Sequence, residues 1–294
     1  WTDILPQQFG AFGMVTDAAW SDTDQDGDED LVLAGEWMPI IILENSQGKL
    51  VNKKIIPNSF GWWSKLVVKD LNRDGKDDYI LGNWGLNSKF RADKSRPLIM
   101  YVKDFDNNKK SDFIINWYPP LDQASFPFAS KKDMLDQLPH LKKTNIKFEE
   151  YANKKYETLF TEQERKNALT YVTNYLESAI LWNDKDSLRL TSLPLEAQVS
   201  PVFAILAEDL DGDDLTDIWL GGNFYGLKPE AGRLDSSHGL LLKGSAAGVF
   251  TPISSVHSGL RVKGEVRDVK TILIKDKPCI LIARNNMNTV CFCK

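Results

Sequence analysis

Acidic residues at alternate positions form the most informative pattern in this sequence. Residues 22–30 read DTDQDGDED and lie between two apolar runs. Carboxylates so close together repel one another unless a cation lies between them. Ca²⁺ prefers about six to eight oxygen ligands, which a short loop supplies from every second residue, with a central glycine allowing the tight turn. The spacing therefore predicts a loop that binds Ca²⁺.

The same nine-residue pattern occurs three more times. Residues 70–78 read DLNRDGKDD, residues 104–112 read DFDNNKKSD, and residues 209–217 read DLDGDDLTD. Short apolar runs rich in Val, Ile, Leu and aromatic residues flank each loop, which is typical of buried strands. Each copy is therefore predicted to be a β-hairpin whose connecting loop carries the acids.

The ligands of each loop follow from its numbering, with the first aspartate as position one. Side chains at positions one, three, five and nine, and the main-chain carbonyl at position seven, are expected to coordinate the ion. In the first two loops these residues are Asp22, Asp24, Asp26, Asp28, Asp30, Asp70, Asn72, Asp74, Lys76 and Asp78. In the other two the expected side-chain ligands are Asp104, Asp106, Asn108, Asp112, Asp209, Asp211, Asp213 and Asp217. We expect the ions to stabilise the fold and not to catalyse a reaction.

Position six is the point where two loops depart from the pattern. It favours a positive φ, and Lys109 and Asp214 stand there in place of glycine. Aspartate tolerates this conformation better than lysine does. Altered geometry is therefore expected at Lys109.

The spacing of the hairpins predicts an all-β fold. Further hairpins are expected at residues 38–55 and 240–253, and a metal-free copy at residues 266–286. Two hairpins per repeat give four antiparallel strands, one blade of a β-propeller, so residues 1–294 are predicted to form one propeller of four to five blades. The second and third loops begin only 34 residues apart, at Asp70 and Asp104. Either the Asp104 hairpin is the outer half of the Asp70 blade, or one blade is abbreviated.

Residues 119–177 interrupt the strand pattern and are predicted to be a helical insertion. Ser130 and Thr161 are typical helix N-caps, the latter with Glu164 in a capping box. Apolar residues at helical spacing extend the prediction to Ala168–Leu176. The insertion is interpreted as a cover for apolar blade surface, with a partner-binding or glycan-facing role as the alternative.

Eight of the nine tryptophans divide into two groups. Trp20, Trp182 and Trp219 lie within strand patterns and are expected in the core. A second group lies at strand ends or in loops, where the rings either contact a ligand such as a sugar or pack between blades. Its members, with one neighbouring tyrosine, are Trp37, Trp62, Trp63, Trp84, Trp117 and Tyr118.

Composition narrows the classes of partner. The net charge of −5 is mild, and no basic tract interleaved with aromatics points to nucleic acid. No apolar segment is long enough for a transmembrane helix. The chain begins at Trp1, so it is interpreted as a processed or excised piece, in which Trp1–Leu5 supplies a missing outer strand or the propeller is incomplete. Three cysteines near the end do not form a disulfide framework by their number and placement.

These loops and strand endings resemble the FG-GAP, or VCBS, repeats of integrin α-type propellers. More closely, the chain resembles the C-terminal part of large bacterial secreted proteins that carry such repeats beside ASPIC/UnbV domains. The matching stretches are residues 13–18, 35–40, 85–88, 193–198 and 283–286. The resemblance implies an exported, extracellular or cell-surface protein with Ca²⁺ as its cofactor.

The resemblance favours a binding module over an enzyme. It implies adhesion or glycan capture, with a protein or glycan partner at one propeller face. His140, His238 and His257 lie far apart in the sequence, and no Gly-x-Ser-x-Gly elbow, phosphate-binding loop or His-Glu-x-x-His pattern occurs. The alternative function is a calcium-dependent propeller polysaccharide lyase or another carbohydrate-active enzyme, and a third is a structural support for a neighbouring domain.

Overall fold

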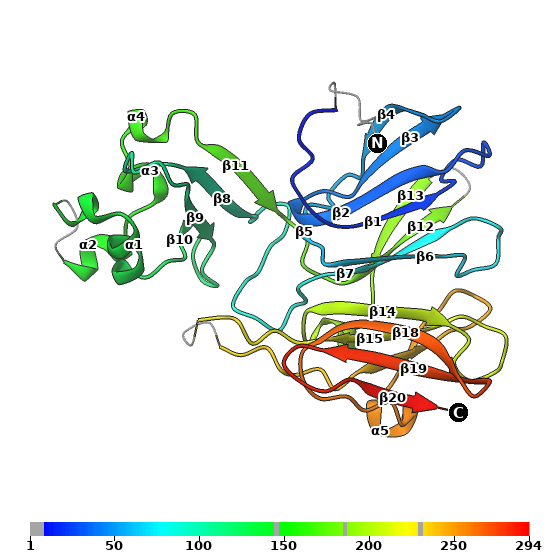
Figure 1. Ribbon diagram of the computed structural model, residues 1–294. Helices are drawn as coiled ribbons and strands as arrows, with labels where there is room; N and C mark the ends of the chain where they lie inside the picture. Colours follow the sequence, from blue (N-terminus) through cyan, green and yellow to red (C-terminus); the bar gives the residue numbers. More distant parts are fainter. Residues whose placement is uncertain (1–8, 144–146, 185–186, 229–231, 294) are drawn as a thin grey trace. The chain divides into compact units, whose positions relative to one another are not determined.

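The structure is a computed structural model that describes residues 9–143, 147–184, 187–228 and 232–293. Antiparallel strands are its main regular elements, with a few short helices (Figure 1). The prediction of an all-β fold is thus confirmed. The chain divides into a main unit, formed by Trp1–Lys89 and Leu176–Lys294, and an inserted unit, formed by Phe90–Tyr175.

Four antiparallel sheets form the main unit, and we name three of them after the acidic loop that each carries. The Asp22 sheet consists of β1 (Met14–Ser21), β2 (Asp30–Met38), β3 (Ile41–Ser46) and β4 (Lys49–Ile55), with β5 (Gly61–Trp62) paired to β2. The Asp70 sheet consists of β6 (Lys65–Lys69), β7 (Asp78–Gly82), β12 (Ala179–Asp184) and β13 (Ser187–Ser192). The Asp209 sheet consists of β14 (Val202–Glu208), β15 (Asp217–Gly222), β16 (Leu240–Lys243) and β17 (Thr251–Ile253). The C-terminal sheet consists of β18 (Val266–Ile274), β19 (Lys277–Arg284) and β20 (Val290–Cys293).

The core of the main unit lies between successive sheets. The first strands pack in sequence, β1 on β6, β6 on β14, and β14 on β18. The second strands β7 and β15 carry no charged residue after their first aspartate and are buried along their whole length. Burial on both faces explains why these strands lack the alternation of a half-exposed strand. Two short helical turns, η3 (Leu195–Gln198) and α5 (Ser255–Ser258), complete the unit.

The inserted unit has its own sheet and its own core. Its strands are β8 (Leu98–Lys103), β9 (Asp112–Trp117), β10 (Phe126–Pro127) and β11 (Leu169–Thr173), in the order β10-β9-β8-β11. We name it the Asp104 sheet. The helical segments are α1 (Lys131–Gln137), η2 (Pro139–Lys143), α2 (Phe148–Ala152), α3 (Tyr156–Leu159) and α4 (Glu162–Arg165). The core consists of side chains from both, among them Phe105, Ile114, Met134, Tyr156 and Phe160.

Both predicted helix starts are confirmed. The Ser130 hydroxyl accepts the Asp133 N–H at the start of α1. At α4, Thr161 and Glu164 form the complete capping box, in which each side chain accepts the other residue's N–H.

The helical prediction for Ala168–Leu176 is wrong. Leu169–Thr173 forms strand β11, which pairs with β8. Two threonines, a valine and a tyrosine in this segment favour a strand. The short apolar pattern fits a helix and a strand equally well, and pairing with the edge of β8 selects the strand.

The interpretation of the Asp104 hairpin as the outer half of the Asp70 blade is also wrong. The Asp104 hairpin, β8 and β9, belongs to a separate sheet that is inserted between β7 and β12 of the Asp70 sheet. The Gly85 N–H donates to the Leu176 carbonyl at 2.8 Å, which holds the two ends of the excursion together within the main unit. The chain therefore forms two strands of the Asp70 sheet, then the whole inserted unit, and then the other two strands of the Asp70 sheet.

Two further expectations need correction, and one lies outside the described residues. Trp182 and Trp219 are buried as predicted, but Trp20 is 52% exposed because it lies on the first strand of the first sheet. Cys279 and Cys293 form a disulfide, which the odd number of cysteines had argued against. The suggested strand at Trp1–Leu5 lies outside the described residues.

Candidate metal centre

Each acidic loop connects the two strands of one β-hairpin. The loops lie between β1 and β2, β6 and β7, β8 and β9, and β14 and β15 (Figure 1). The ninth residue is the first residue of the following strand in every copy. The sequence repeat is therefore also a structural repeat.

Hydrogen bonds tie the side chains at positions one, three and five to the main chain of the loop. In the Asp22 loop, Asp22 Oδ1 accepts the Asp26 N–H at 3.1 Å, and Asp22 Oδ2 accepts the Gly27 N–H at 3.1 Å. Asp24 Oδ1 also accepts the Asp26 N–H, and Asp26 Oδ1 accepts the Asp28 N–H at 2.9 Å. The Asp70 and Asp104 loops repeat all four bonds, and the Asp209 loop varies only the first. The side-chain oxygens at positions one, three and five are thus bonded to the loop main chain in the same way in every copy.

The converging oxygens fit a hard cation. In three loops, one carboxylate oxygen from each of three acids lies within 4.8 Å of the others; the groups are Asp22, Asp24 and Asp26; Asp104, Asp106 and Asp112; and Asp209, Asp211 and Asp217. The donors are oxygens alone, the set that Ca²⁺ prefers over softer metals. In the Asp70 loop, Asn72 supplies an amide oxygen at position three. Bound Ca²⁺ would supply the positive charge that offsets the mutual repulsion of these groups.

The ninth-position aspartate has a second role that the sequence did not reveal. Asp30, Asp78, Asp112 and Asp217 are each at most 5% exposed. In each, Oδ2 accepts the N–H of loop position two. In Asp30, Asp78 and Asp217, Oδ1 accepts a main-chain N–H at the far end of the third strand, from Asn45, Asn183 and Gly244 respectively. The carboxylate therefore fastens the loop to the neighbouring hairpin.

In the Asp104 sheet, Oδ1 of the ninth-position aspartate, Asp112, has a different kind of donor. The third strand of this sheet is only two residues long, and the Gln137 side-chain amide of α1 donates to Asp112 Oδ1 at 3.2 Å. The equivalent bond thus survives with a side-chain donor. Burial raises the pKa of Asp78 and of Asp217, although the bonds to main-chain N–H groups oppose this shift.

The Asp22 and Asp70 loops are also bonded to each other. The Gln25 side-chain amide donates to the Gly75 carbonyl at 3.1 Å, and the Asn183 side chain donates to the Thr23 carbonyl at 2.9 Å. The Asp28 carboxylate, whose carbonyl was the predicted ligand, accepts the Gln47 N–H of the β3–β4 turn at 2.7 Å. Neighbouring loops thus form a connected polar layer.

The backbone at position six is left-handed in every loop, as predicted. Lys109 has φ of 68° and Asp214 has φ of 66°, where the first two loops use Gly27 and Gly75. Position four is left-handed too, which the sequence analysis missed although Asn107 and Gly212 there are residues that tolerate this conformation. Lys109 is therefore a strained position within an otherwise regular loop.

The Asp209 loop differs from the others because it contains its own cation. The Lys243 ammonium, at the end of β16, forms ion pairs with the Asp211 carboxylate and with Asp213 Oδ2, the latter at 3.1 Å. These are the ligands predicted at positions three and five. The contacts raise the pKa of Lys243, while a main-chain bond from Leu215 and the Lys243 contact lower that of Asp213. Among the described residues, no lysine or arginine pairs with the acids of the other three loops.

Aromatic side chains gather at the opposite end of the second strands. The ring centroids of Trp37 and Trp62 are 5.1 Å apart, those of Trp62 and Trp84 5.3 Å, and those of Trp84 and Phe224 5.6 Å. Phe203 extends this aromatic row at 6.2 Å from Phe224. Trp37 and Trp62 are buried, whereas Trp84, Phe224 and Phe203 are half-buried. The row therefore reaches solvent at one end.

An ion pair continues the aromatic row. The Arg267 guanidinium lies 4.6 Å from the Phe203 ring centroid and 2.7 Å from Glu265 Oε1. Burial tends to raise the pKa of Glu265, but bonds from the Tyr225 N–H and the Asn285 side chain, together with Arg267, lower it overall. The row thus ends in a buried carboxylate that stays ionised.

The other three aromatic candidates do not join this row. Trp63 is fully buried, and its indole N–H donates to the Ser59 carbonyl. Trp117 and the half-buried Tyr118 belong to the inserted unit, where Trp117 packs edge-to-face on Phe128. Of the six predicted ligand-contacting residues, the structure thus brings together Trp37, Trp62 and Trp84.

Comparison with known proteins adds one match. The model of the FG-GAP-like repeat family matches residues 22–81, a span from the first acidic loop to the strand after the second. Residues 22–81 are thus an FG-GAP-like repeat, which confirms that part of the sequence interpretation. None of the curated proteins compared with the chain matches it. Across the described ranges, no helix combines the length and apolar character needed to cross a membrane.

Replacing Lys109 with glycine should stabilise the inserted unit. The left-handed conformation costs an L-residue about 1–2 kcal/mol, and the entropy of glycine offsets part of this gain. We expect Lys109→Gly to raise the free energy of unfolding in urea by roughly 0.5–1 kcal/mol. Lys110→Gly, one residue on and without a positive φ, is the matched control and should destabilise the protein. Equal destabilisation by both variants would show that the backbone at Lys109 is not strained.

Removing the Lys243 charge should open the Asp209 loop to Ca²⁺. A unit charge about 4 Å away contributes on the order of 1 kcal/mol even in water, which corresponds to roughly fivefold in affinity. Lys243→Met should therefore strengthen the weakest Ca²⁺-binding step by about that factor or more, measured by competition with a chromophoric chelator. Lys54→Met, which removes an exposed lysine from β4, should leave that step unchanged. The same isotherm for Lys243→Met and for the unaltered protein would show that Lys243 does not compete.

Proposed function

We propose that this chain is a calcium-binding β-propeller that serves as an extracellular binding or adhesion scaffold, without enzymatic activity. The observation that carries the proposal is the fourfold recurrence of one loop geometry, in which side-chain oxygens accept main-chain N–H groups of the loop and, in three loops, three carboxylate oxygens lie within 4.8 Å of one another. The FG-GAP-like repeat over residues 22–81 supports a propeller-type scaffold. Successive packing of the first strands of four sheets is in keeping with this architecture.

A structural role for the ion follows from where the loops are attached. Each loop begins and ends at a strand, and its ninth residue is bonded both to the start of the loop and to an adjacent element. An ion bound by positions one, three and five would hold the same backbone that the buried aspartate anchors. Binding to the folded state alone would therefore stabilise the sheets. Loops of modest affinity suit the millimolar Ca²⁺ outside cells, which is why we place the protein there.

The aromatic row supports a binding role at the end of the strands away from the acidic loops. Half-buried rings of Trp84, Phe224 and Phe203 offer flat apolar edges beside the Arg267 guanidinium. Rigid aromatic and arginine side chains are the groups that most often dominate protein interfaces, and aromatic faces also stack on sugars. A protein or glycan partner is therefore proposed for this surface. The lyase alternative is not favoured, because the acids that converge in the described residues lie in the metal loops.

Calcium should raise the thermal stability of the protein. At a hundredfold excess over the dissociation constant, each occupied site adds about 2.7 kcal/mol. Since about 1 kcal/mol shifts the Tm of a domain of roughly 150–250 residues by about 2–4 °C, we expect each occupied site to make the Tm several degrees higher in Ca²⁺ than in EDTA. Differential scanning calorimetry at constant ionic strength measures this difference.

Matched variants assign the effect to the loops. Asp74→Asn removes a charge from position five and should reduce the calcium-dependent shift, whereas Asp122→Asn removes an exposed charge outside the loops and should preserve it. Identical melting in Ca²⁺ and EDTA would refute the stabilising role. An unaltered shift in Asp74→Asn would place the ion elsewhere.

A further inference from the structure

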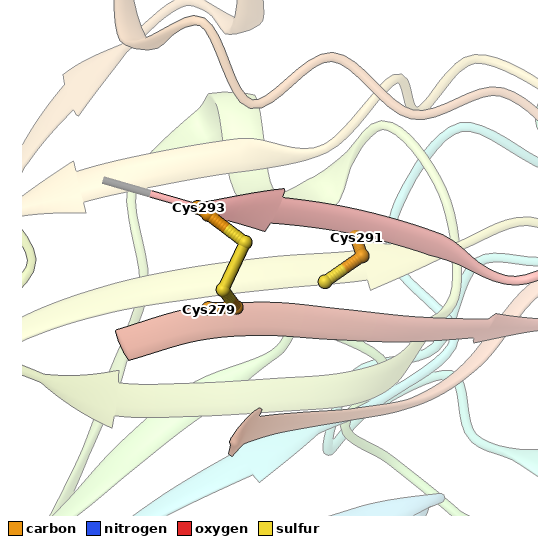
Figure 2. A group of neighbouring side chains, drawn as sticks. All are labelled: Cys279, Cys291 and Cys293. Atoms are coloured by element: carbon orange, nitrogen blue, oxygen red, sulfur yellow. A yellow bond between two sulfur atoms is a disulfide. The ribbon is translucent and has the colours of Figure 1, made fainter. Parts of the chain in front are cut away.

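Three sulfur atoms gather on one face of the C-terminal sheet. Cys279 lies on β19, and Cys291 and Cys293 lie two residues apart on β20 (Figure 2). In the strand register Cys279 pairs with Cys293, and Leu281 pairs with Cys291. Side chains two residues apart share a face of the strand, and directly opposed residues do so as well. The topology of the hairpin thus brings all three cysteines to one face.

The three sulfur atoms lie within 4.8 Å of one another. Cys279 and Cys293 are joined by a disulfide, and the thiol of Cys291 is directed towards that bond (Figure 2). Cys279 is 1% exposed, whereas Cys291 and Cys293 are exposed on a strand at the end of its sheet. One cysteine of the cluster is thus buried, and the other two are exposed residues.

We propose that the reduced protein binds one thiophilic cation, such as Zn²⁺ or Cu⁺, through Cys279, Cys291 and Cys293. A dithiol reductant transfers two electrons and two protons to the Cys279–Cys293 bond and becomes a disulfide itself. Three thiols result. Each gives up its proton when it coordinates, so three protons are released per ion.

The spacing suits such an ion. Metal–sulfur distances of about 2.3 Å place three thiolates around one ion roughly 4 Å apart. The observed group, within 4.8 Å, needs only rotation of the side chains and small shifts to reach this arrangement. Thiolates select soft or borderline metals, whereas the acidic loops offer oxygen alone. The sulfur site is therefore chemically distinct from the calcium loops and does not rest on the function proposed for them.

Oxidation state would control the site. With the disulfide intact, Cys291 is the remaining free thiol of the cluster, and one thiol does not make a specific site. Reduction supplies the other two ligands at once. The site thus forms under reducing conditions and is lost when the disulfide forms.

Titration with Cd²⁺ tests the proposal through sulfur-to-metal charge-transfer absorbance in the ultraviolet. Protein reduced with a dithiol, freed of reductant under argon, should bind one Cd²⁺ per chain, and Zn²⁺ should displace it. The oxidised protein should show no such band. Cys291→Ser keeps the disulfide pair but, when reduced, should bind Cd²⁺ more weakly by over about tenfold, since loss of even an outer-shell partner costs that much. Asn288→Ser, at an exposed position of the same hairpin, should bind like the unaltered protein.

Two outcomes would overturn the proposal. One is equal Cd²⁺ affinity of the reduced protein and reduced Cys291→Ser. The other applies if reduction unfolds the chain: Zn²⁺ must then restore the β-sheet circular dichroism and protect all three thiols from iodoacetamide. If Zn²⁺ fails in either respect, the site is excluded.

Discussion

A buried carboxylate at the ninth loop position is the constraint on which the rest of the structure depends. Placing an ionised group where almost no water reaches costs several kcal/mol unless its oxygens are hydrogen-bonded. Asp30, Asp78 and Asp217 meet this requirement with two main-chain N–H groups each, one from the loop and one from the third strand. The same bonds fix where the second strand begins and how the next hairpin aligns. The acidic loop and the sheet are thus one cooperative unit, and an ion held by the other loop positions would add to that unit.

The remaining acids of each loop need positive charge from elsewhere. Main-chain N–H groups supply part of it at positions one, three and five, but these partial charges do not balance three carboxylates. The Asp209 loop gains an ammonium group from Lys243, and the other loops have no such partner among the described residues. The same loop geometry therefore occurs with an ammonium group in the Asp209 loop and, in the part of the chain that the structure describes, without one in the other loops. We interpret the Asp209 loop as the copy that depends least on metal.

The sequence predicted what is local and failed where distant segments decide the outcome. Alternating acids, the left-handed position six and the caps at Ser130 and Thr161 all follow from a few neighbouring residues, and the structure has the geometry expected of them. The insertion between β7 and β12 was missed because strand pairing across about 100 residues leaves no local pattern. Lys243 follows Asp211 by 32 residues, and only the β15–β16 pairing brings them together. Exposure of Trp20 likewise depends on which sheet comes first, which its own strand does not encode.

Equilibrium dialysis against buffered Ca²⁺, followed by elemental analysis, tests the central claim most directly. We expect about three bound ions per chain at millimolar Ca²⁺, one in each loop that lacks an internal ammonium group, with a fourth binding only at higher concentration. A stoichiometry near zero across the millimolar range typical of extracellular modules would contradict it. The alternating carboxylates would then be held by their hydrogen bonds alone.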